Sequence, residues 1–360
     1  MTPSDGRPDV PSDNETAPAA QAVAEPNATP LLSVRNLSVE FATNEGWLRV
    51  AEDLNFDLEA GESLGLAGES GSGKTVTGLA IMGLIQLPQG RLGEGSSIRF
   101  QGQELVGMRA KQLNRLRGDD IVMIFQEPMA SLNPAFTVGH QIAEVVRNHK
   151  GLSKKDAWRR AEEMLEIVNI PSPKGRARSY PHQFSGGMAQ RAMIAMALAN
   201  DPKLLIADEP TTALDVTVEA DVLDTLRSLQ REFDMGVLLI THDLGVIESF
   251  CNRAIIMYAG QIVAGAPVEP LFAKPLHPYV EGLIGSIPNP KDEGERMWSI
   301  PGTVPPPSAT PEGCHFHPRC NYAEPGRCTS SPIALEPVGN DRLVRCVRAD
   351  ELDLQGIVNE

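Results

Sequence analysis

The sequence predicts an α/β fold built around a parallel sheet. Short apolar runs typical of strands recur along the chain, at 63–67, 121–125, 204–207, 237–240 and 254–258. Stretches with helical periodicity separate these runs, for example 138–149, 155–168 and 218–233. Strands that alternate with helices favour parallel pairing. The composition agrees, because 41% of the 360 residues are hydrophobic and 22% are charged, which is enough to bury a sizeable core.

The net charge limits the classes of partner. Lys and Arg number 32 against 47 Asp and Glu, which leaves a formal charge of −15. No Lys/Arg-rich block interrupts this acidic balance, so we expect no nucleic-acid partner. No stretch approaches the roughly 18 uninterrupted apolar residues of a membrane span. The N-terminus also lacks the basic start and apolar run of a secretory signal, so we expect a cytosolic protein.

The amino-acid composition changes at both ends of the sequence. Residues 1–30 contain six Pro, six Ala and five acidic residues, and they lack Ile, Leu and Phe. Such a segment buries too little apolar surface to offset its ordering entropy, so we interpret it as a disordered tail. Alternating strand character begins at 31–41. From Pro275 onward proline becomes dense and four of the five cysteines appear, which predicts a separate, loop-rich extension.

A phosphate-binding loop is the strongest local signal. The pattern G-x-x-x-x-G-K-[ST] is formed by Gly68, Glu69, Ser70, Gly71, Ser72, Gly73, Lys74 and Thr75. It follows the strand at 63–67 and precedes a helix-compatible run at 76–85, a context that a flexible Gly/Ser turn does not require. The glycines let successive backbone N–H groups face a phosphate, and the helix N-terminus adds positive potential. Lys74 would bridge the terminal phosphates, and the Thr75 hydroxyl would ligate Mg²⁺.

A pair of carboxylates follows the apolar strand at 204–207. Asp208 lies 134 residues after Lys74, and Glu209 comes next. A carboxylate at a strand end can hold Mg²⁺, usually through water, and its neighbour can polarise the attacking water. Such a pair alone is more often a solvated turn, but with Lys74 it predicts a nucleotide-hydrolysing site.

The order of further motifs resembles that of the ATP-binding cassette (ABC) ATPases. The resemblance implies that Gln126 is the Q-loop glutamine, which contacts Mg²⁺ and senses the membrane partner. It implies that His242 is the switch histidine at the γ-phosphate and that Asp215 closes the D-loop. Phe41 stands where an aromatic residue stacks on adenine, and Trp47 is the less favoured candidate. Each residue alone also fits an ordinary loop or core role, and the shared order carries the resemblance.

The run 184–188 resembles the family's LSGGQ signature motif. Ser185, Gly186 and Gly187 open a helix at 188–200 that is apolar nearly all round. The positive end of a buried helix is a ready anion site. Because the chain already has a phosphate-binding loop, the resemblance implies that two cassettes pair head to tail. Each signature motif then caps the ATP held by the partner cassette.

Several longer segments of the sequence resemble the ATP-binding subunits of bacterial oligopeptide/dipeptide importers. The likeness spans about 31–348 and includes late segments at 277–279 (HPY), 300–307 (IPGTVPPP) and 313–320 (GCHFHPRC). It implies a P-loop NTPase cassette at 31–265, with a RecA-like core, N-terminal β strands and a helical subdomain inserted at about 127–200. A peptide-importer-type extension would then cover 266–360.

The resemblance also implies partners and a location. The chain would be an ATPase subunit on the cytoplasmic face of the bacterial inner membrane. It would act with a second ATPase subunit in a heterodimer or a homodimer, with two integral membrane permease subunits and, indirectly, with an extracytoplasmic solute-binding protein. The permeases would dock on an apolar, solvent-facing groove of the helical subdomain, although the helices at 138–149 and 155–169 also fit ordinary packing helices. A nickel or glutathione importer, or a soluble non-transport ABC ATPase, remains an alternative.

Four cysteines fall within the Pro-rich extension. Cys314, Cys320, Cys328 and Cys346 are separated by five, seven and seventeen residues. A segment with so few core-forming residues needs a staple, and a reducing cytosol disfavours two disulfides. A Cys₄ zinc site, with His315 or His317 in place of one thiol, fits the residue types, and the spacing does not choose the metal. The resemblance implies a [4Fe–4S] cluster, with reduced unliganded thiols as the alternative.

Overall fold

Two sheets organise the chain in the computed structural model, which describes residues 29–212, 215–287, 299–339 and 341–356. The expected tail therefore lies almost entirely outside the described residues. The smaller sheet has the order β2-β1-β5-β6, with β4 paired to β1. It is formed by β1 (Leu32–Thr43), β2 (Gly46–Leu58), β4 (Gly90–Leu92), β5 (Ser97–Phe100) and β6 (Gln103–Glu104).

The larger sheet has the order β12-β13-β11-β10-β3-β9-β8-β7. Its strands are β3 (Ser63–Ala67), β7 (Ile121–Ile124), β8 (Leu204–Asp208), β9 (Gly236–Thr241), β10 (Arg253–Tyr258), β11 (Gln261–Pro267), β12 (Glu336–Pro337) and β13 (Leu343–Val344). The five strands from β10 to β7 pair in parallel, whereas β11, β12 and β13 pair antiparallel. The predicted parallel α/β core is confirmed, and each predicted strand agrees with the structure to within two residues at either end.

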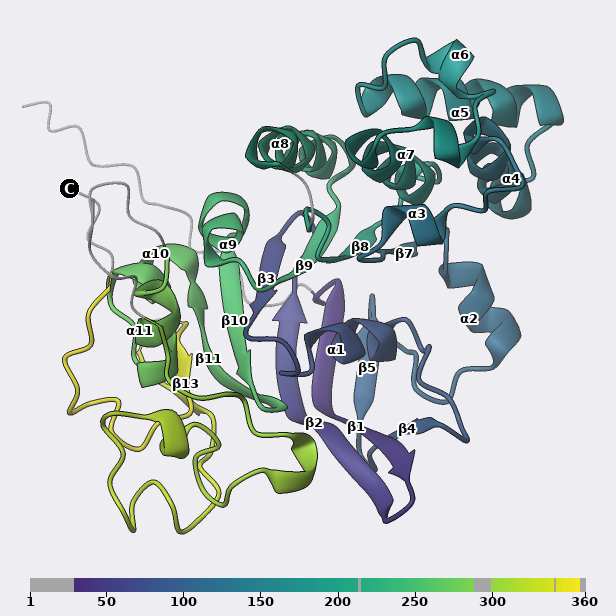
Figure 1. The fold of residues 1–360 in the computed structure, drawn as a ribbon. Helices are drawn as coiled ribbons and strands as arrows, with labels where there is room; N and C mark the ends of the chain where they lie inside the picture. The colour runs from purple at the N-terminus through teal and green to yellow at the C-terminus, as the bar shows by residue number, and fades with distance from the viewer. Residues whose placement is uncertain (1–28, 213–214, 288–298, 340, 357–360) are drawn as a thin grey trace, which may run out of the picture.

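Helices cover both faces of the larger sheet (Figure 1). The longer ones are α1 (Lys74–Ile81), α4 (Val138–Lys150), α5 (Lys154–Ile167), α7 (Gly186–Leu198) and α8 (Val216–Phe233). The shorter ones are α2 (Ala110–Leu116), α3 (Pro128–Ser131), α6 (Pro173–Arg176), α9 (Leu244–Phe250), α10 (Val268–Ala273) and α11 (Pro278–Ile284). Single 3₁₀ turns are η1 (Pro181–Gln183), η2 (Pro307–Ala309) and η3 (His317–Arg319).

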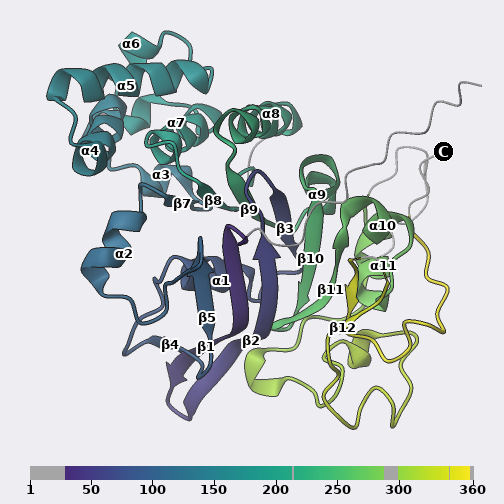
Figure 2. The same ribbon diagram turned by 180° about the vertical axis from the view of Figure 1, so that it is seen from behind.

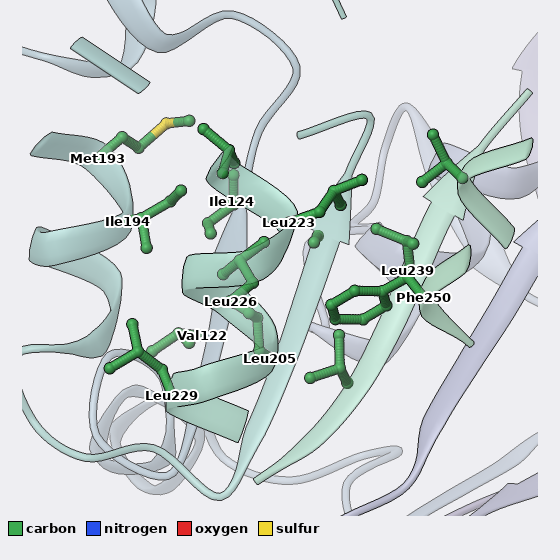
Figure 3. Packing of buried hydrophobic residues seen from close by; sticks show 14 of the residues in the cluster. Val122, Ile124, Met193, Ile194, Leu205, Leu223, Leu226, Leu229, Leu239 and Phe250 are labelled. Carbon is green, nitrogen blue, oxygen red and sulfur yellow. The ribbon is translucent and has the colours of Figure 1, made fainter. Parts of the chain in front are cut away.

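Alternate residues of the central strands enter two separate hydrophobic clusters. Leu205 and Leu239 face α7, α8 and α9, where their side chains meet Leu226 and Phe250 (Figure 3). Their strand neighbours, among them Ile206, pack instead with α1 and the smaller sheet. Because both faces are covered, these strands are continuous apolar runs, which is why the sequence identified them so clearly.

Helices α3 to α6 form a projection between β7 and α7, at the upper right of Figure 1. The α4–α5 turn is well defined, since Gly151 ends α4 in the left-handed region and Ser153 caps α5 by accepting the backbone N–H of Asp156. The facing sides of the two helices are buried, including Ile142 and Leu165. This projection occupies the predicted helical subdomain.

The C-terminal extension shares the sheet and core of the cassette. Strand β13 pairs with β11 through Gly265 and Leu343, so the extension lengthens the larger sheet at one edge (Figure 2). Phe316 is buried within the larger hydrophobic cluster. Much of the described extension beyond α11 is loop, as its proline content predicts. Within the part of the chain that the structure describes, no helix is long and apolar enough to cross a membrane.

Candidate nucleotide-binding site

The phosphate-binding loop turns sharply between β3 and α1, and two glycines make this turn possible. Gly68 has φ +150°, and a Cβ there would lie 2.1 Å from the carbonyl oxygen of Met257 on β10. Gly73 begins α1 with φ +101°, and a Cβ there would lie 3.0 Å from the carbonyl oxygen of Val50 on β2. Any other residue at Gly68 would collide with backbone, so the predicted loop is held in one shape by β2 and β10.

Lys74 is buried beneath this loop, with 6% of its surface exposed. Its ammonium donates hydrogen bonds to the carbonyl oxygens of Gly68 at 2.6 Å and Glu69 at 3.0 Å. Burial lowers the pKa of Lys74, while the nearby carboxylates of Glu209 and Asp208 oppose this effect. A cation at the first turn of α1, beside the helix N-terminus, suits the terminal phosphates of a nucleotide.

Thr75 and Asp208 bring two oxygen ligands together. The Thr75 hydroxyl donates to Asp208 Oδ1 at 3.2 Å, across the gap between α1 and the carboxyl end of β8. Burial raises the pKa of Asp208, and the hydrogen bond from Thr75 opposes this rise. A hydroxyl beside a carboxylate is a donor set that Mg²⁺ prefers, so these residues fit the predicted magnesium site.

Glu209 lies at the centre of a hydrogen-bond network that joins three strand ends. Its Oε2 accepts the Gln126 amide at 2.8 Å and the Thr212 hydroxyl at 2.8 Å, and its Oε1 lies 3.0 Å from His242 Nδ1. The residue has φ +48°, a strained conformation of the kind that clusters at functional sites. Burial raises the pKa of Glu209, but the hydrogen bonds from Thr212 and His242 and the charge of Lys74 outweigh it and lower the pKa overall.

The sequence prediction brought Gln126, Glu209 and His242 to one site, and the structure places them within hydrogen-bond distance. Thr212 was missed, because a threonine after a strand has no distinguishing pattern. Of the two adenine candidates, Phe41 is half-buried beside Gly90, whereas Trp47 is exposed with the Arg91 guanidinium 4.2 Å from its ring centroid. The stacking residue stays a prediction.

The signature segment begins α7, on the opposite face of the larger sheet from α1 (Figure 1). Ser185 caps this helix by accepting the Met188 backbone N–H at 3.4 Å. A Cβ at Gly187 would lie 2.8 Å from Val218 on α8, so this glycine permits close packing of the two helices. Among the described residues, no hydrogen bond joins 185–187 to the phosphate-binding loop.

The D-loop is described only at its end. Asp215 caps α8 by accepting the Val218 backbone N–H at 3.0 Å. The preceding residues, 213–214, lie outside the described part of the chain.

An apolar groove lies between the larger sheet and the helical subdomain. It is open to solvent and is lined by Met82, Gly118, Val122, Met123, Phe125, Ser131, Val145, Met193, Met196 and Ala197. Three large apolar side chains in this part of the molecule face solvent, namely Phe125 at 42%, Met129 at 46% and Phe136 at 46% exposed. An apolar groove thus borders the region for which one is predicted, and its use as a permease contact stays a prediction.

The four late cysteines line one small pocket. The same pocket is lined by His277, which is 1% exposed. His277 Nδ1 accepts the Tyr279 backbone N–H at 3.1 Å, which leaves the proton on Nε2, and among the described residues Nε2 has no hydrogen-bond partner. The type of these groups, several thiols beside a buried N–H without a partner, fits a metal bound by thiolates.

These side chains lie too far apart in this structure to form a metal site. Within the described ranges, no three His, Cys, Asp or Glu side chains lie close enough to hold a metal ion. His317 lines the cysteine pocket, whereas His315 points elsewhere, with its Nδ1 2.9 Å from the Ala259 carbonyl oxygen. Of the two histidines considered as zinc ligands, only His317 lines this pocket.

Comparisons with known proteins agree with this geometry. A family model described as ABC transporter matches residues 51–212, and one described as the C-terminal region of oligopeptide/dipeptide transporters matches 265–328. The oligopeptide transport ATP-binding protein OppD of Salmonella typhimurium is 47% identical over 324 residues, which are 90% of this chain and 95% of that relative. The chain belongs to the oligopeptide/dipeptide importer family of ABC ATP-binding subunits. It is therefore an ABC-type ATPase subunit.

Further relatives of this importer subunit give the same result. The oligopeptide transport ATP-binding protein AppD of Bacillus subtilis is 45% identical over 321 residues, covering 89% of this chain and 97% of that relative. A solved dimeric structure of the ATP-binding cassette MJ0796, bound to ADP and phosphate, has a TM-score of 0.59 and 26% identity. It covers 66% of this chain and 98% of its own, so the cassette fold predicted for this subunit is confirmed.

Proposed function

We propose that this subunit hydrolyses ATP to drive the uptake of peptides through separate membrane subunits. One observation carries the proposal: Glu209 is held between Gln126 and His242, next to the pair formed by Asp208 and Thr75. This arrangement combines a general base with a magnesium donor set at the mouth of a phosphate-binding loop. The relatives named for oligopeptide transport support the peptide substrate.

The side chains of the site have distinct roles in this proposal. Lys74 binds the terminal phosphates, and Thr75, Asp208 and Gln126 would hold Mg²⁺, which would neutralise charge on the phosphoryl group. Glu209 orients the attacking water and accepts its proton, for which its lowered pKa keeps the carboxylate ionised at neutral pH. His242 fixes the Glu209 carboxylate from the opposite side and contacts the γ-phosphate.

The remaining nucleotide contacts come from the loop backbone and from a second cassette. Backbone N–H groups of the loop cradle the phosphates, and Phe41 stacks on adenine. Ser185, Gly186 and Gly187 cap the nucleotide of the partner cassette, because α7 begins on the far side of the sheet from α1. Asp215 joins the two cassettes. The partner is a second, different ATPase subunit, and a homodimer is the alternative outcome.

The permease subunits dock in the apolar groove. We assign residues 31–265 to the nucleotide-binding domain, about 127–200 to its helical subdomain and 266–360 to the importer-type extension. An exposed groove lined by Phe125, Met123 and Met193 suits an amphipathic helix, since flexible methionines adapt to an apolar partner. The subunit then lies peripherally on the cytoplasmic face of the bacterial membrane, and the extracytoplasmic solute-binding protein acts through the permeases.

Reconstitution with its membrane subunits tests this function. The subunit, its copurifying permeases and the solute-binding protein are placed in proteoliposomes with MgATP. Uptake of labelled di- and oligopeptides is expected, with no uptake when Glu209→Gln replaces the wild type. Uptake of nickel or glutathione instead would reassign the substrate. ATP hydrolysis without any copurifying membrane protein would favour a soluble ABC ATPase.

The cysteine pocket is proposed to hold a [4Fe–4S] cluster with a structural or sensory role. Four thiols around one pocket, which His277 also lines, support this assignment. Closing the remaining gaps between the side chains would require the loops of the extension to contract around the metal. Anaerobically purified protein is expected to be brown, and Cys320→Ser is expected to remove the colour. Colourless protein with stoichiometric zinc would identify a zinc site, and metal-free protein would leave reduced thiols.

A further inference from the structure

The phosphate-binding loop is tied to the C-terminal extension at Glu69. Both carboxylate oxygens of Glu69 accept from Arg319 Nη1, at 3.1 and 3.0 Å. The backbone N–H of Glu69 donates to the Tyr279 hydroxyl at 2.9 Å, and its carbonyl oxygen accepts from Lys74. The side chain, N–H and carbonyl of one loop residue are therefore all engaged, two of them by residues more than 200 positions away.

The Arg319 side chain is buried and fixed by several hydrogen bonds. Its side chain is only 7% exposed. Its Nε donates to the Pro301 carbonyl oxygen at 2.8 Å, and its Nη1 lies 3.3 Å from the Tyr258 hydroxyl. Burial acts to lower the pKa of Arg319, but hydrogen bonds with Tyr258 and Glu69 outweigh burial and raise it. A long side chain fixed on several sides presents its charge to Glu69 at little further entropic cost.

An unpaired carboxylate at this position would oppose nucleotide binding. Glu69 acts electrostatically on the Lys74 ammonium, together with Glu209 and Asp208. Without Arg319, the Glu69 charge would compete with a phosphate for Lys74 and would repel the phosphates directly. Arg319 therefore supplies, from outside the loop, the positive charge that balances Glu69.

We propose that Arg319 is a positioning residue for the ATP site, which holds and neutralises Glu69 so that the loop and Lys74 are free to receive the phosphates. The inference rests on the proposed nucleotide site. It makes the C-terminal extension part of the machinery that sets ATP affinity. Because Arg319 lies between Cys314 and Cys320, a rearrangement of this cysteine loop would reach the nucleotide through the same contact.

Equilibrium binding of MgADP and MgATP to the full chain tests the proposal. Arg319→Gln is expected to weaken MgATP binding about tenfold, the size of one charge-assisted hydrogen bond. The KM for ATP should rise by the same factor while kcat stays within about twofold, because the loop binds ground state and transition state alike. The double variant Glu69→Gln/Arg319→Gln should recover most of the lost affinity, since the repelling charge is gone.

Matched variants separate this role from a structural one. Arg327→Gln removes another paired arginine of the same extension, which contacts Glu351 and Glu324, and should bind MgATP as the wild type does. Arg319→Lys keeps the charge and should lose less affinity than Arg319→Gln, which also covers the case in which the Gln variant folds poorly. Melting temperatures of all variants are measured alongside.

The outcomes distinguish this inference from the proposed function. Wild-type affinity in Arg319→Gln would overturn the inference and leave the nucleotide site intact. Equal weakness in Arg319→Gln and in the double variant would also overturn it, because the effect would not pass through Glu69. Wild-type protein that fails to bind MgATP would instead refute the nucleotide site itself.

Discussion

Replacing Glu209 by Gln separates ATP binding from ATP hydrolysis. The side chain accepts hydrogen bonds from Gln126 and Thr212 on one oxygen, while His242 lies against the other. A glutamine can keep its oxygen toward Gln126 and Thr212 and turn its amide toward His242. The variant therefore preserves the shape of the site and most of its hydrogen bonds, and it loses the ability to accept a proton.

The size of the effect follows from that single loss. Removing a positioned general base costs roughly 10²–10⁴ in rate, or about 3–5 kcal/mol in the activation barrier. Binding of MgATP should change by no more than about threefold, because Lys74, Thr75 and Asp208 are untouched. A cassette that holds ATP without hydrolysing it should also accumulate as an ATP-bound dimer.

The assay is single-turnover hydrolysis of MgATP by the complete ATPase pair, with equilibrium binding and size-exclusion chromatography in parallel. Glu232→Gln, an exposed position on α8, serves as the control and should behave as the wild type. Normal turnover in Glu209→Gln would refute the reasoning and place the catalytic carboxylate elsewhere. If the variant loses both ATP binding and turnover, Glu209 maintains the structure of the site rather than acting as a base.

Four further predictions concern the same site. Lys74→Ala should abolish measurable MgATP binding by calorimetry, because the loop loses its phosphate-bridging cation. Gly68→Ala should do the same and lower the melting temperature, since its Cβ would lie 2.1 Å from the Met257 carbonyl oxygen. Because the pKa of Glu209 is lowered in the folded protein, its contacts stabilise the fold at pH values above the ordinary pKa of 4.5. This stabilisation is lost as the pH falls through the lower pKa of the folded state. The urea midpoints of the wild type and of Glu209→Gln should therefore converge below pH 4.5. In a homodimer, mixing Lys74→Ala with a Gly187 variant should restore part of the hydrolysis that each lacks alone, and strictly monomeric protein with full activity would contradict pairing of the cassettes.

The sequence predicted the central sheet and grouped the candidate site residues for one physical reason. Strands such as β8 are buried on both faces, so they are uninterrupted apolar runs, and the carboxylates that follow them mark the strand ends. Strand β2 was missed because exposed positions such as Trp47 and Arg49 near its start alternate with only partly buried ones, which interrupts its apolar pattern. The docking of the extension was also invisible in the sequence, because β13 has only two residues and Arg319 belongs to the single 3₁₀ turn η3.

The contacts of the phosphate-binding loop suggest that nucleotide binding and hydrolysis are controlled from different places. The loop is shaped by carbonyl oxygens of β2 and β10 at Gly73 and Gly68, and by the extension at Glu69. All of these contacts lie within one chain and restrict the conformations of the loop, so phosphate binding has less conformational entropy to lose. The signature segment at Ser185 begins on the other face of the sheet and cannot close over the same loop. Under the proposed function, a single subunit is therefore organised to bind ATP, whereas its catalytic site is completed by a second cassette, and this division would couple hydrolysis to assembly.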